Sequence, residues 1–551
     1  MAAIMRRTEP DRNPPTNPTK RFRAPMRAVL WVALAADLVV LPLASQAAAY
    51  FYTDLNPSGF IESFGYGISG SQQVGSRRDA AGAGHALLWS GTASSAVDLH
   101  PSGFKISQAY GSSGSQQVGY GDGHALLWSG TASGVVDLHP SGFFDSEARG
   151  ISGGQQVGDG RTAQLGRLLL HALLWSGTAS SVVDLNPNGF TESVAPGTSG
   201  SQQVGSGKLA GTNIRHALLW SGTASSVVDL HPTGFDSSAA FGTLGGQQVG
   251  NGAGPATGGN SHALLWSGTV GSVVDLHPSG FIVSEASATS GSQQVGFGLG
   301  PAFHGTHALL WSGTASSVVD LHSFLSTDYA DSQATGIDAI GNVVGYATYI
   351  PTGSSHAILW TLVPERVVLG NEPGQCGAVY TYSTGSTAAT CSPPSGSFFP
   401  VGNTTVTCTS TNPPNTFTFN VIVEDREAPL AACRPAPNPS GKKIPVAGKN
   451  GDSGQNPDGY YQLLAKDNCD AGLKLFVADT ASAFIAGPFA SGDIVKITQD
   501  PDDTPDSQPG AQNVVAHIHL NGDALLYAVD ASGNVGATVL CAVVVPPKVA
   551  N

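Results

Sequence analysis

The chain has 551 residues, of which 12% are charged and 71 are glycine, and acidic residues outnumber basic ones by 39 to 25. Its length allows about three or four domains, and the low charge with abundant Gly favours short strands and turns over long charged helices. The net charge of −14 argues against nucleic acid or an anionic membrane as the main partner, because phosphate binding requires a basic surface.

Residues 1–49 have the layout of a secretory signal peptide. Seven of the 25 basic residues precede Ala28, an apolar run extends to Ala44, and small residues follow to Ala49. Met26 offers a shorter and more typical start. We predict export with cleavage and no integral membrane span afterwards; the alternative is an uncleaved anchor, against which Asp37 within the run argues. Cleavage changes the net charge to −18, since this segment holds seven of the 25 basic and three of the 39 acidic residues.

The motif His-Ala-(Leu/Ile)-Leu-Trp occurs seven times, and its tryptophans are separated by 39, 47, 45, 46, 45 and 49 residues. Within one copy, four strand-like pieces at 105–112, 116–120, 124–129 and 135–138 alternate with turns rich in Gly and Ser. Four short strands in every ~40 to 50 residues are typical of a propeller blade. We therefore predict an all-β protein with a seven-bladed β-propeller over residues 50–370.

The two ends of the repeat region bear on whether the ring closes. Residues 50–60 look like a fourth strand with no blade before it, and 366–370 form a competing outer strand for the last blade. One of the two would complete that blade, and the other would be a fifth strand or a linker. An open right-handed solenoid is the alternative architecture. We favour a closed ring, because the orphan strand would otherwise leave an exposed edge.

Each repeat carries one His before Ala, one Asp before Leu and one Trp. A metal or proton-relay array would need three or four groups converging on one ion, which equivalent positions in separate blades do not provide. We expect the polar residues to bond neighbouring backbone or side chains and the tryptophans to pack between blades rather than to present sugar platforms. We predict no catalytic set, no metal site and no cofactor.

The copies differ mainly between the second and third strands, and function in repeat proteins concentrates where loops vary. These segments reach the same propeller face as the fourth-to-first turns, and they hold six of the nine basic residues between positions 50 and 370. An acidic glycan or a carboxylate-bearing partner would suit them; solvated loop tips are the alternative. The candidate ligand-binding residues are Arg77, Arg78, Arg161, Arg167, Lys208 and Arg215.

A second variable set lies in the first strand of each repeat, near the expected axis. These residues either shape a central channel or fit the inner taper of the blades, and the taper is the simpler interpretation. The set is Tyr66, Tyr110, Arg149, Pro196, Phe241, Ser287 and Thr335; the channel candidates among them are Tyr66, Tyr110, Arg149 and Phe241.

The repeat over residues 61–370 resembles the HAF repeat of bacterial extracellular proteins, whose core reads roughly His-Ala-Phe-Leu-Trp followed by Asp-Leu-Gly. In this chain Leu or Ile replaces the Phe, and His or Asn replaces the Gly, as in Asp98-Leu99-His100 and Asp184-Leu185-Asn186. The resemblance implies an exported propeller and little about its activity.

The composition changes after Gly370, and the cysteines appear only there, at Cys376, Cys391, Cys408, Cys433, Cys469 and Cys541. In an exported chain we expect disulfides among them, in any of 15 connectivities. In the same region, His517 and His519 lie on one face of a strand without an identifiable third ligand. The acidic loop around Asp500 and Asp506 lacks the spacing of a calcium loop.

The stretch from Cys391 to Cys408, with Pro-Ser-Gly, Phe-Pro-Val-Gly and Thr-Val-Thr-Cys in register, closely resembles the hyalin (HYR) repeat over about residues 371–429. The resemblance implies an immunoglobulin-like β-sandwich associated with extracellular adhesion, and it favours a pair between Cys391 and Cys408. The family often has a cysteine near Phe417, which leaves the partner of Cys376 open. Residues 430–551 end on a similar closing pattern, which predicts a second, diverged sandwich.

The function we expect is that of a secreted or cell-surface binding or adhesion protein, monomeric and not an enzyme, whose propeller face recognises an extracellular glycan or protein. The alternative is an extracellular glycosidase or polysaccharide lyase, which needs a carboxylate pair unique to one or two blades. Glu147 with Arg149, and Glu285, are the candidates. Motifs of serine hydrolases, zinc proteases and phosphate loops do not occur. A structural surface-layer protein is a third possibility, distinguished by self-association.

Overall fold

The computed structural model describes residues 49–78, 82–164, 167–300, 305–382, 389–411, 414–436, 459–498 and 514–542. The predicted signal peptide up to residue 48 and the acidic loop around Asp500 lie outside these ranges. The described residues form β-strands joined by turns and short 3-10 helices. Among them, no helix is long and apolar enough to cross a membrane.

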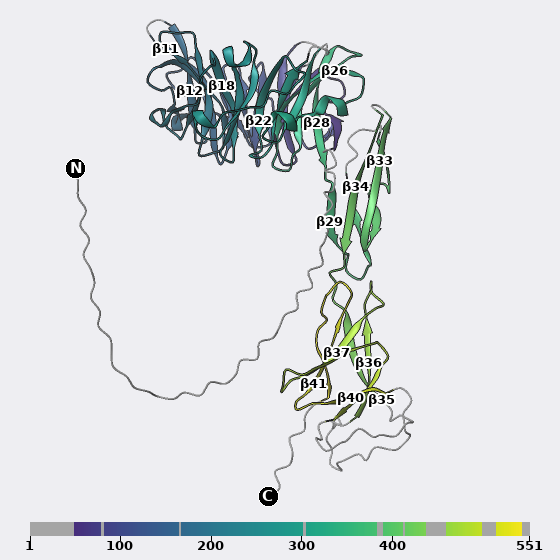
Figure 1. Cartoon of the computed structure of the whole chain (residues 1–551). Coiled ribbons are helices and arrows are strands. Elements are labelled where there is room, and N and C mark those ends of the chain that lie inside the picture. Colours follow the sequence, from purple (N-terminus) through teal and green to yellow (C-terminus); the bar gives the residue numbers. More distant parts are fainter. Residues whose placement is uncertain are drawn as a thin grey trace, which may run out of the picture. The chain divides into compact units, whose positions relative to one another are not determined.

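Seven four-stranded antiparallel sheets form the blades of a β-propeller, which confirms the predicted fold class (Figure 1). From the axis outward they are blade 1, β2 (Glu62–Ser69), β3 (Gln72–Arg78), β4 (Gly84–Trp89) and β5 (Val97–Asp98); blade 2, β6 (Ser107–Ser113), β7 (Gln116–Gly121), β8 (His124–Trp128) and β9 (Val136–Asp137); blade 3, β10 (Asp145–Ser152), β11 (Gln155–Gln164), β12 (Arg167–Trp175) and β13 (Val183–Asp184); blade 4, β14 (Phe190–Thr198), β15 (Gln203–Leu209), β16 (Arg215–Trp220) and β17 (Val228–Asp229); blade 5, β18 (Ser237–Leu244), β19 (Gln247–Ala253), β20 (His262–Trp266) and β21 (Val274–Asp275); blade 6, β22 (Val283–Thr289), β23 (Gln294–Leu299), β24 (Thr306–Trp311) and β25 (Val319–Asp320); and blade 7, β26 (Tyr329–Ile337), β27 (Val343–Tyr349), β28 (Ser354–Val363) and β1 (Ala49–Asp54).

Short 3-10 helices fill the connections. They are η1 (Ala93–Ser95), η2 (Ala132–Gly134), η3 (Ala179–Ser181), η4 (Ala224–Ser226), η5 (Pro255–Thr257), η6 (Val270–Ser272), η7 (Ala315–Ser317) and η8 (Leu321–Phe324). Most of them follow the Trp-Ser-Gly-Thr segment, where the second Gln of Gln-Gln-Val-Gly helps to fix the turn. In blade 2, for example, the side-chain oxygen of Gln117 accepts a hydrogen bond from the Gly130 amide at 2.9 Å.

The hydrophobic core of the propeller consists of clusters between adjacent blades. Between blades 3 and 4, Val157, Leu174 and Leu185 pack against Leu218 and Trp220. The Trp of the repeat motif is fully buried in all seven blades, as expected for a packing role. Because large aromatic side chains dominate the free energy of burial, one tryptophan per interface explains why this residue recurs with the blade.

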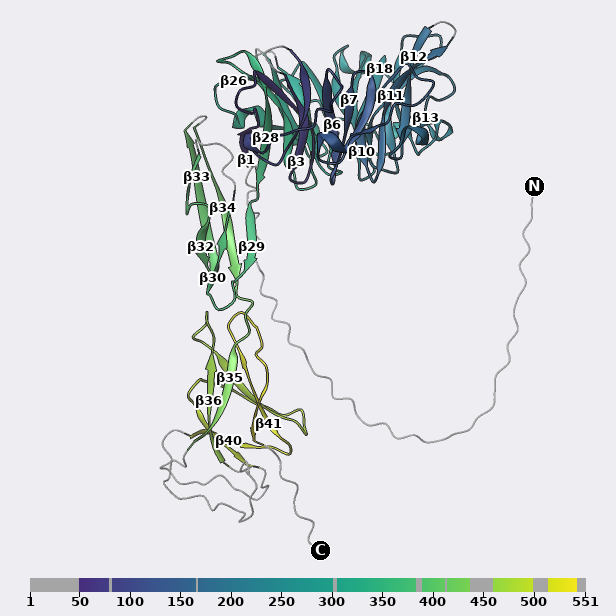
Figure 2. The same cartoon turned by 180° about the vertical axis from the view of Figure 1, so that it is seen from behind.

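The N-terminal strand closes the ring. Strand β1 pairs antiparallel with β28, from Ala49 opposite Val363 to Asp54 opposite Ile358, and the two strands lie side by side in Figure 2. His356 Nδ1 lies 2.7 Å from Asp54 Oδ2. The closed ring is therefore the observed architecture, and the open solenoid is excluded. The competing strand β29 (Arg366–Gly370) pairs in parallel with β34 instead, so it belongs to the next domain rather than to the last blade.

Two further pairs of sheets follow the propeller. The first set joins β29, β34 (Pro414–Glu424), β33 (Gly402–Thr411) and β31 (Ala389–Ser392) in one sheet and β30 (Gly377–Tyr380) with β32 (Ser397–Pro400) in another. The second set also has two sheets. One joins β35 (Leu430–Ala436), β36 (Gly459–Lys466), β39 (Ile494–Thr498) and β40 (Val514–His519). The other joins β38 (Ile485–Phe489), β37 (Lys474–Asp479), β41 (Ala524–Val529) and β42 (Val539–Ala542). Each set encloses its own apolar residues, so both are sandwich-like.

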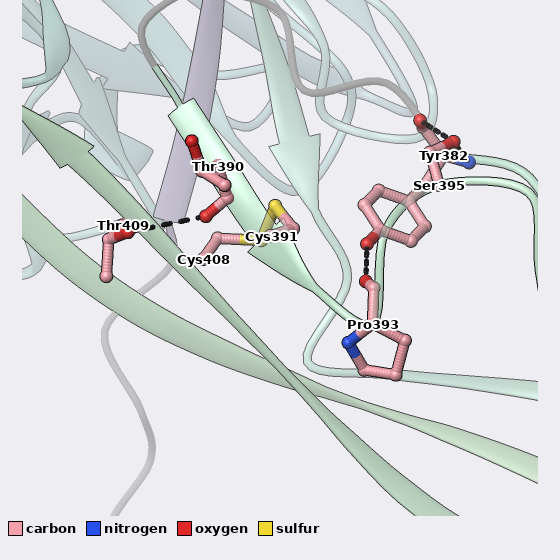
Figure 3. Close-up of a disulfide and its surroundings, with 7 residues drawn as sticks. All are labelled: Tyr382, Thr390, Cys391, Pro393, Ser395, Cys408 and Thr409. Atoms are coloured by element: carbon pink, nitrogen blue, oxygen red, sulfur yellow. Dashed lines mark hydrogen bonds between the residues drawn. A yellow bond between two sulfur atoms is a disulfide. The ribbon is translucent and has the colours of Figure 1, made fainter.

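The structure contains two disulfides, one in each sandwich. Cys391 and Cys408, the pair that the HYR resemblance favours, are joined across the neighbouring strands β31 and β33. Figure 3 shows this bond beside the contact from Thr409 Oγ1 to the Thr390 carbonyl oxygen at 3.4 Å. Cys433 and Cys541 join β35 to β42, which ties together the two sheets of the second sandwich.

Candidate functional site

The first strand of every blade contains a β-bulge at the same place. The register between the first and second strands shifts there, so one residue of the first strand is left without a partner, or two in blade 4. Bulges redirect side chains and often lie next to functional sites. The bulged positions are Tyr66, Tyr110, Arg149, Pro196 with Ala195, Phe241, Ser287 and Thr335, which is the variable first-strand set of the sequence.

The glycine of Gln-Gln-Val-Gly allows the first strand to come this close. A Cβ atom on Gly119 would lie 1.9 Å from the carbonyl oxygen of Gln108, and one on Gly158 would lie 1.9 Å from that of Glu147. No side chain fits at such a distance. The repeated glycine is therefore a steric requirement of the bulge.

The bulged residues line a cavity of about 320 Å³ at the axis of the ring. All seven blades contribute, and small residues such as Gly67, Gly111 and Gly150 also line the cavity. Of the two interpretations of these positions, the structure favours a central pocket over a mere fit to the inner taper, because Tyr66, Tyr110, Arg149 and Phe241 all face one space. We call this cavity the axial pocket.

Blade 3 places a charged cluster beside the axial pocket. Arg149 Nε lies 2.8 Å from Asp159 Oδ1, and its NH2 group lies 2.7 Å from Glu147 Oε2. Burial raises the pKa of both carboxyl groups, and the Arg149 guanidinium opposes that rise. Since one cation faces two carboxylates, Arg149 has little charge left for an anionic ligand, while the cluster still offers hydrogen-bond donors and acceptors.

Aromatic rings form an arc of contacts that runs from blade 7 through blade 1 to blade 2 and includes Tyr66 and Tyr110 of the axial pocket. Phe64 lies parallel to Tyr66 at 6.1 Å and edge-on to Tyr346 at 5.2 Å, and Tyr66 contacts Tyr110 at 5.4 Å between ring centroids. The hydroxyl of Tyr110 donates to Gln108 Oε1 at 2.7 Å. Aromatic faces next to a few fixed polar groups are the usual lining of a small-molecule site.

Glu285 of blade 6 is a separate acidic group near this arc. Asn251 Nδ2 donates to Glu285 Oε2 at 2.9 Å. Burial raises the pKa of Glu285 to about 7, against a smaller opposing effect of this hydrogen bond. The carboxyl group is therefore partly protonated at neutral pH and able to donate a proton.

Four of the six basic residues predicted on the variable loops are paired within their own blades. Arg77 contacts Asp98 at 2.8 Å and His85 at 2.9 Å, and it lies over the Phe60 ring at 3.9 Å with 11% of its side chain exposed. The other pairs are Arg78 with Glu62, Arg161 with Asp145 and Arg215 with Glu192.

Arg167 and Lys208 differ from these four, since neither has an ion pair among the described residues. Arg167 is exposed at the start of β12, and Lys208 is half-buried in β15. None of the six lines the cavity to which the first-strand residues of all seven blades contribute.

The recurring His and Asp residues form a local network in every blade. The Nδ1 atom of the motif histidine lies 2.7 to 2.9 Å from an Asp Oδ2 in all seven blades. In blade 1, His85 also stacks on His100, whose Nδ1 lies 2.8 Å from Ser107 Oγ, and that oxygen accepts from the Ala86 amide. These residues therefore bond to their neighbours and, through Ser107 of blade 2, link adjacent blades, which is the local role expected from the sequence.

Sequence reasoning missed the second-strand residues of the site. Asp159, Asn251 and Tyr346 each follow the glycine of the Gln-Gln-Val-Gly segment or its counterpart. This position also varies between blades, and the register places it opposite the first-strand residue two before the bulge, as in Asp159 opposite Glu147. Variation next to an invariant glycine was thus a signal that could have been found.

No protein-family model matches the chain, and no curated protein matches it. Distant solved structures include a puromycin hydrolase mutant (13% identity, 58% of this chain and 56% of that chain, TM-score 0.40) and a putative TolB from Agrobacterium tumefaciens (12%, 58% and 99%, TM-score 0.31). Another is the β-propeller domain of the Trilobed protease from Pyrococcus furiosus (9%, 56% and 95%, TM-score 0.34). The chain spans little more than half of the first of these. Such matches indicate nothing about activity.

Proposed function

We propose that this is a secreted or cell-surface binding protein that recognises an extracellular glycan through the axial pocket. The observation that carries the proposal is the axial pocket itself. A ring of near-identical blades presents different side chains, including Tyr66, Tyr110, Arg149 and Phe241, at one repeated bulge. Packing alone would be served by the same residue in each blade.

The chemistry of the axial pocket suits a neutral sugar. The apolar faces of a sugar ring can pack on Tyr66 and Tyr110, and its hydroxyl groups can bond to the hydroxyl groups of Ser112 and Thr243, which line the same cavity. The cavity of about 320 Å³ is at the small end of ligand pockets, so we propose a mono- or disaccharide unit at the end of a chain. Arg149 is already paired with two carboxylates, which disfavours an acidic glycan.

The proposal also covers the compartment in which the protein acts and the role of its C-terminal domains. The disulfides Cys391–Cys408 and Cys433–Cys541 are typical of proteins in oxidising compartments, and the likeness to HAF and HYR repeats points the same way. We propose that the C-terminal sandwiches act as spacer or adhesive modules and that the chain is a monomer.

A glycan array of neutral and acidic sugars, probed with the full chain, tests the proposal. We expect binding to a neutral glycan, with at least a tenfold loss of affinity in Tyr110→Ala, because the variant removes an aromatic face on which the sugar ring packs. Arg167→Ala in β12 and Lys208→Ala in β15 are matched controls outside the axial pocket, and they should bind as the wild type does. Loss of binding in these controls alone would move the site to this part of the second and third strands.

A second candidate function rests on Glu285, whose raised pKa is typical of a general acid. On this alternative the propeller is a glycosidase in which Glu285 protonates the leaving oxygen. Incubation of the bound glycan with the protein, followed by product analysis, separates the two functions. Cleavage that is lost in Glu285→Gln while binding persists would support the enzyme; intact glycan supports the binding protein.

A further inference from the structure

Two cysteines remain outside the two disulfides, and they face each other. Cys376 lies in the loop between β29 and β30, and Cys469 lies in the turn after β36. The Cys376 thiol donates to the carbonyl oxygen of Asn468, the residue before Cys469. The Cys469 thiol in turn contacts the carbonyl oxygen of Gln375, the residue before Cys376, at 3.6 Å.

Amide side chains hold the two loops against each other. Asn468 Nδ2 donates to the carbonyl oxygen of Gln375 at 3.1 Å and to Glu427 Oε2 at 2.8 Å. Asn371 Nδ2 contacts Cys469 Sγ at 3.8 Å. Each cysteine is therefore within reach of the other, on backbone segments that are fixed by further hydrogen bonds.

We propose that Cys376 and Cys469 form a third disulfide, which covalently links the two C-terminal sandwiches. The other four cysteines are already paired within their own sandwiches, so this bond would complete the pairing of all six. Unlike those two bonds, it joins residues of different sandwiches, and its closure would restrict motion between them.

The surroundings disfavour the alternative of a reactive thiol. Burial, a hydrogen bond with Cys376 and the neighbouring Asp425 carboxylate raise the pKa of Cys469 to about 12. A thiol that stays protonated is a poor nucleophile and a poor redox sensor. A cystine carries no charge, so it is compatible with the carboxylates of Asp425 and Asp467 close by.

The bond forms by ordinary thiol–disulfide exchange. The thiolate of Cys376 attacks a donor disulfide, such as that of an oxidoreductase of the oxidising compartment, and gives a mixed disulfide. Cys469 then gives up its proton and displaces the donor sulfur. The two thiols lose two protons and two electrons in total, and the donor disulfide is reduced to a dithiol.

The main alternative to a disulfide between Cys376 and Cys469 is a metal ion bound at the same position. One ligand atom each from Asp425, Asp467 and Cys469 lie within 4.8 Å of one another, and Cys376 would add a second sulfur. Soft thiolate ligands with carboxylates would suit zinc. The test must therefore separate a cystine from a pair of metal-bound thiolates.

The full chain, exported to an oxidising compartment and purified without reductant, is denatured with a maleimide reagent and a chelator present and digested without reduction. We expect a linked peptide pair that contains Cys376 and Cys469, with neither residue labelled. The pairs Cys391–Cys408 and Cys433–Cys541 in the same digest show that oxidation was complete. Labelling of both Cys376 and Cys469 with these controls intact would overturn the proposal, and so would stoichiometric zinc in the native protein.

The variants Cys376→Ser and Cys469→Ser provide a second measurement. Each should convert the remaining cysteine into a labelled residue and leave the two other disulfides unchanged. An unlabelled Cys469 in Cys376→Ser would show that it pairs elsewhere and would also contradict the proposal.

Discussion

The outer parts of the blades and their inner strands follow opposite rules. In the outer parts, one network of His, Asp, Gln and Trp recurs in each blade with nearly constant distances, such as the His–Asp contacts of 2.7 to 2.9 Å. At the inner bulges the backbone is nearly constant, but six different side chains occupy the bulged position, with Tyr in both blades 1 and 2. The comparison teaches that the repeat keeps the outer residues and the backbone constant, which together we call the frame. It leaves one side-chain position per blade free to set specificity.

We expect the largest loss of stability from a substitution that fills the space under a bulge. Gly158→Ala places a Cβ atom 1.9 Å from the Glu147 carbonyl oxygen, so the two strands must separate and the blade loses pairing. We expect a loss of at least about 4 kcal/mol in the free energy of unfolding, or failure to fold. Urea denaturation followed by tryptophan fluorescence measures it.

A matched glycine outside the bulge serves as the control. Gly271 has open space around its Cβ position, and other repeats carry Ser there, as at Ser94 and Ser180. Gly271→Ser should leave stability within about 0.5 kcal/mol. If both variants were equally destabilised, the steric argument for the bulge would be wrong.

Removing one aromatic ring from the frame and one from the axial pocket compares how much each region contributes to stability. Trp220→Ala opens a cavity in a fully buried interface and should cost roughly 3–5 kcal/mol. Tyr110→Ala removes a ring that lines the axial pocket and should destabilise the protein clearly less, while it should lower the affinity for the ligand at least tenfold. Equal costs in urea denaturation would contradict the division into frame and site.

Glu285 gives the inner region its own dependence on pH. Its folded pKa of about 7 lies above the value of an unfolded Glu, so it favours the folded state at low pH, and this contribution is lost as the pH rises from about 4.5 to 7. We expect Glu285→Gln to stabilise the protein by roughly 2 kcal/mol at pH 8 relative to wild type and to have no effect at pH 4. Thermal unfolding at both pH values tests the sign.

His322 gives the frame the opposite dependence. Burial, and then the neighbouring His307, lower the pKa of His322 to about 4, so its contribution to stability is present above about pH 6.5 and is lost as the pH falls toward 4. With allowance for solvent screening, we expect a loss on the order of 1 kcal/mol. His322→Asn, which copies Asn186 of blade 3, should remove this dependence. An unchanged pH profile in the variant would contradict it.

Much of the frame could be predicted from the sequence, because repetition reveals it. The strand positions, the buried tryptophans and the local role of the histidines all follow from the period and from the apolar pattern. The role of Arg366–Gly370 could not be predicted, since its apolar residues suit either a blade edge or a sandwich. Its parallel pairing with β34 depends on contacts far along the chain.

The candidate site was less accessible to sequence reasoning. The variable first-strand residues were found, but their common direction depends on a bulge, which a pattern of alternation does not reveal. The arginines predicted on the loops could not be assigned ion-pair partners from the sequence, because those partners are distant along the chain. Arg77, for example, bonds to Asp98, 21 residues later. Whether a charge is paired depends on hairpin geometry.

The closing strand also sets the order in which the propeller can fold. Asp54 and His356 are 302 residues apart, whereas the strands within blades 1 to 6 pair over short distances in sequence. Contacts of long sequence separation form slowly, because loop closure costs entropy before it yields any stabilisation. Six blades can thus assemble as the chain emerges, and the seventh must wait until residue 360 is available. Until then, β1 lacks the β28 strand with which it pairs in the closed ring.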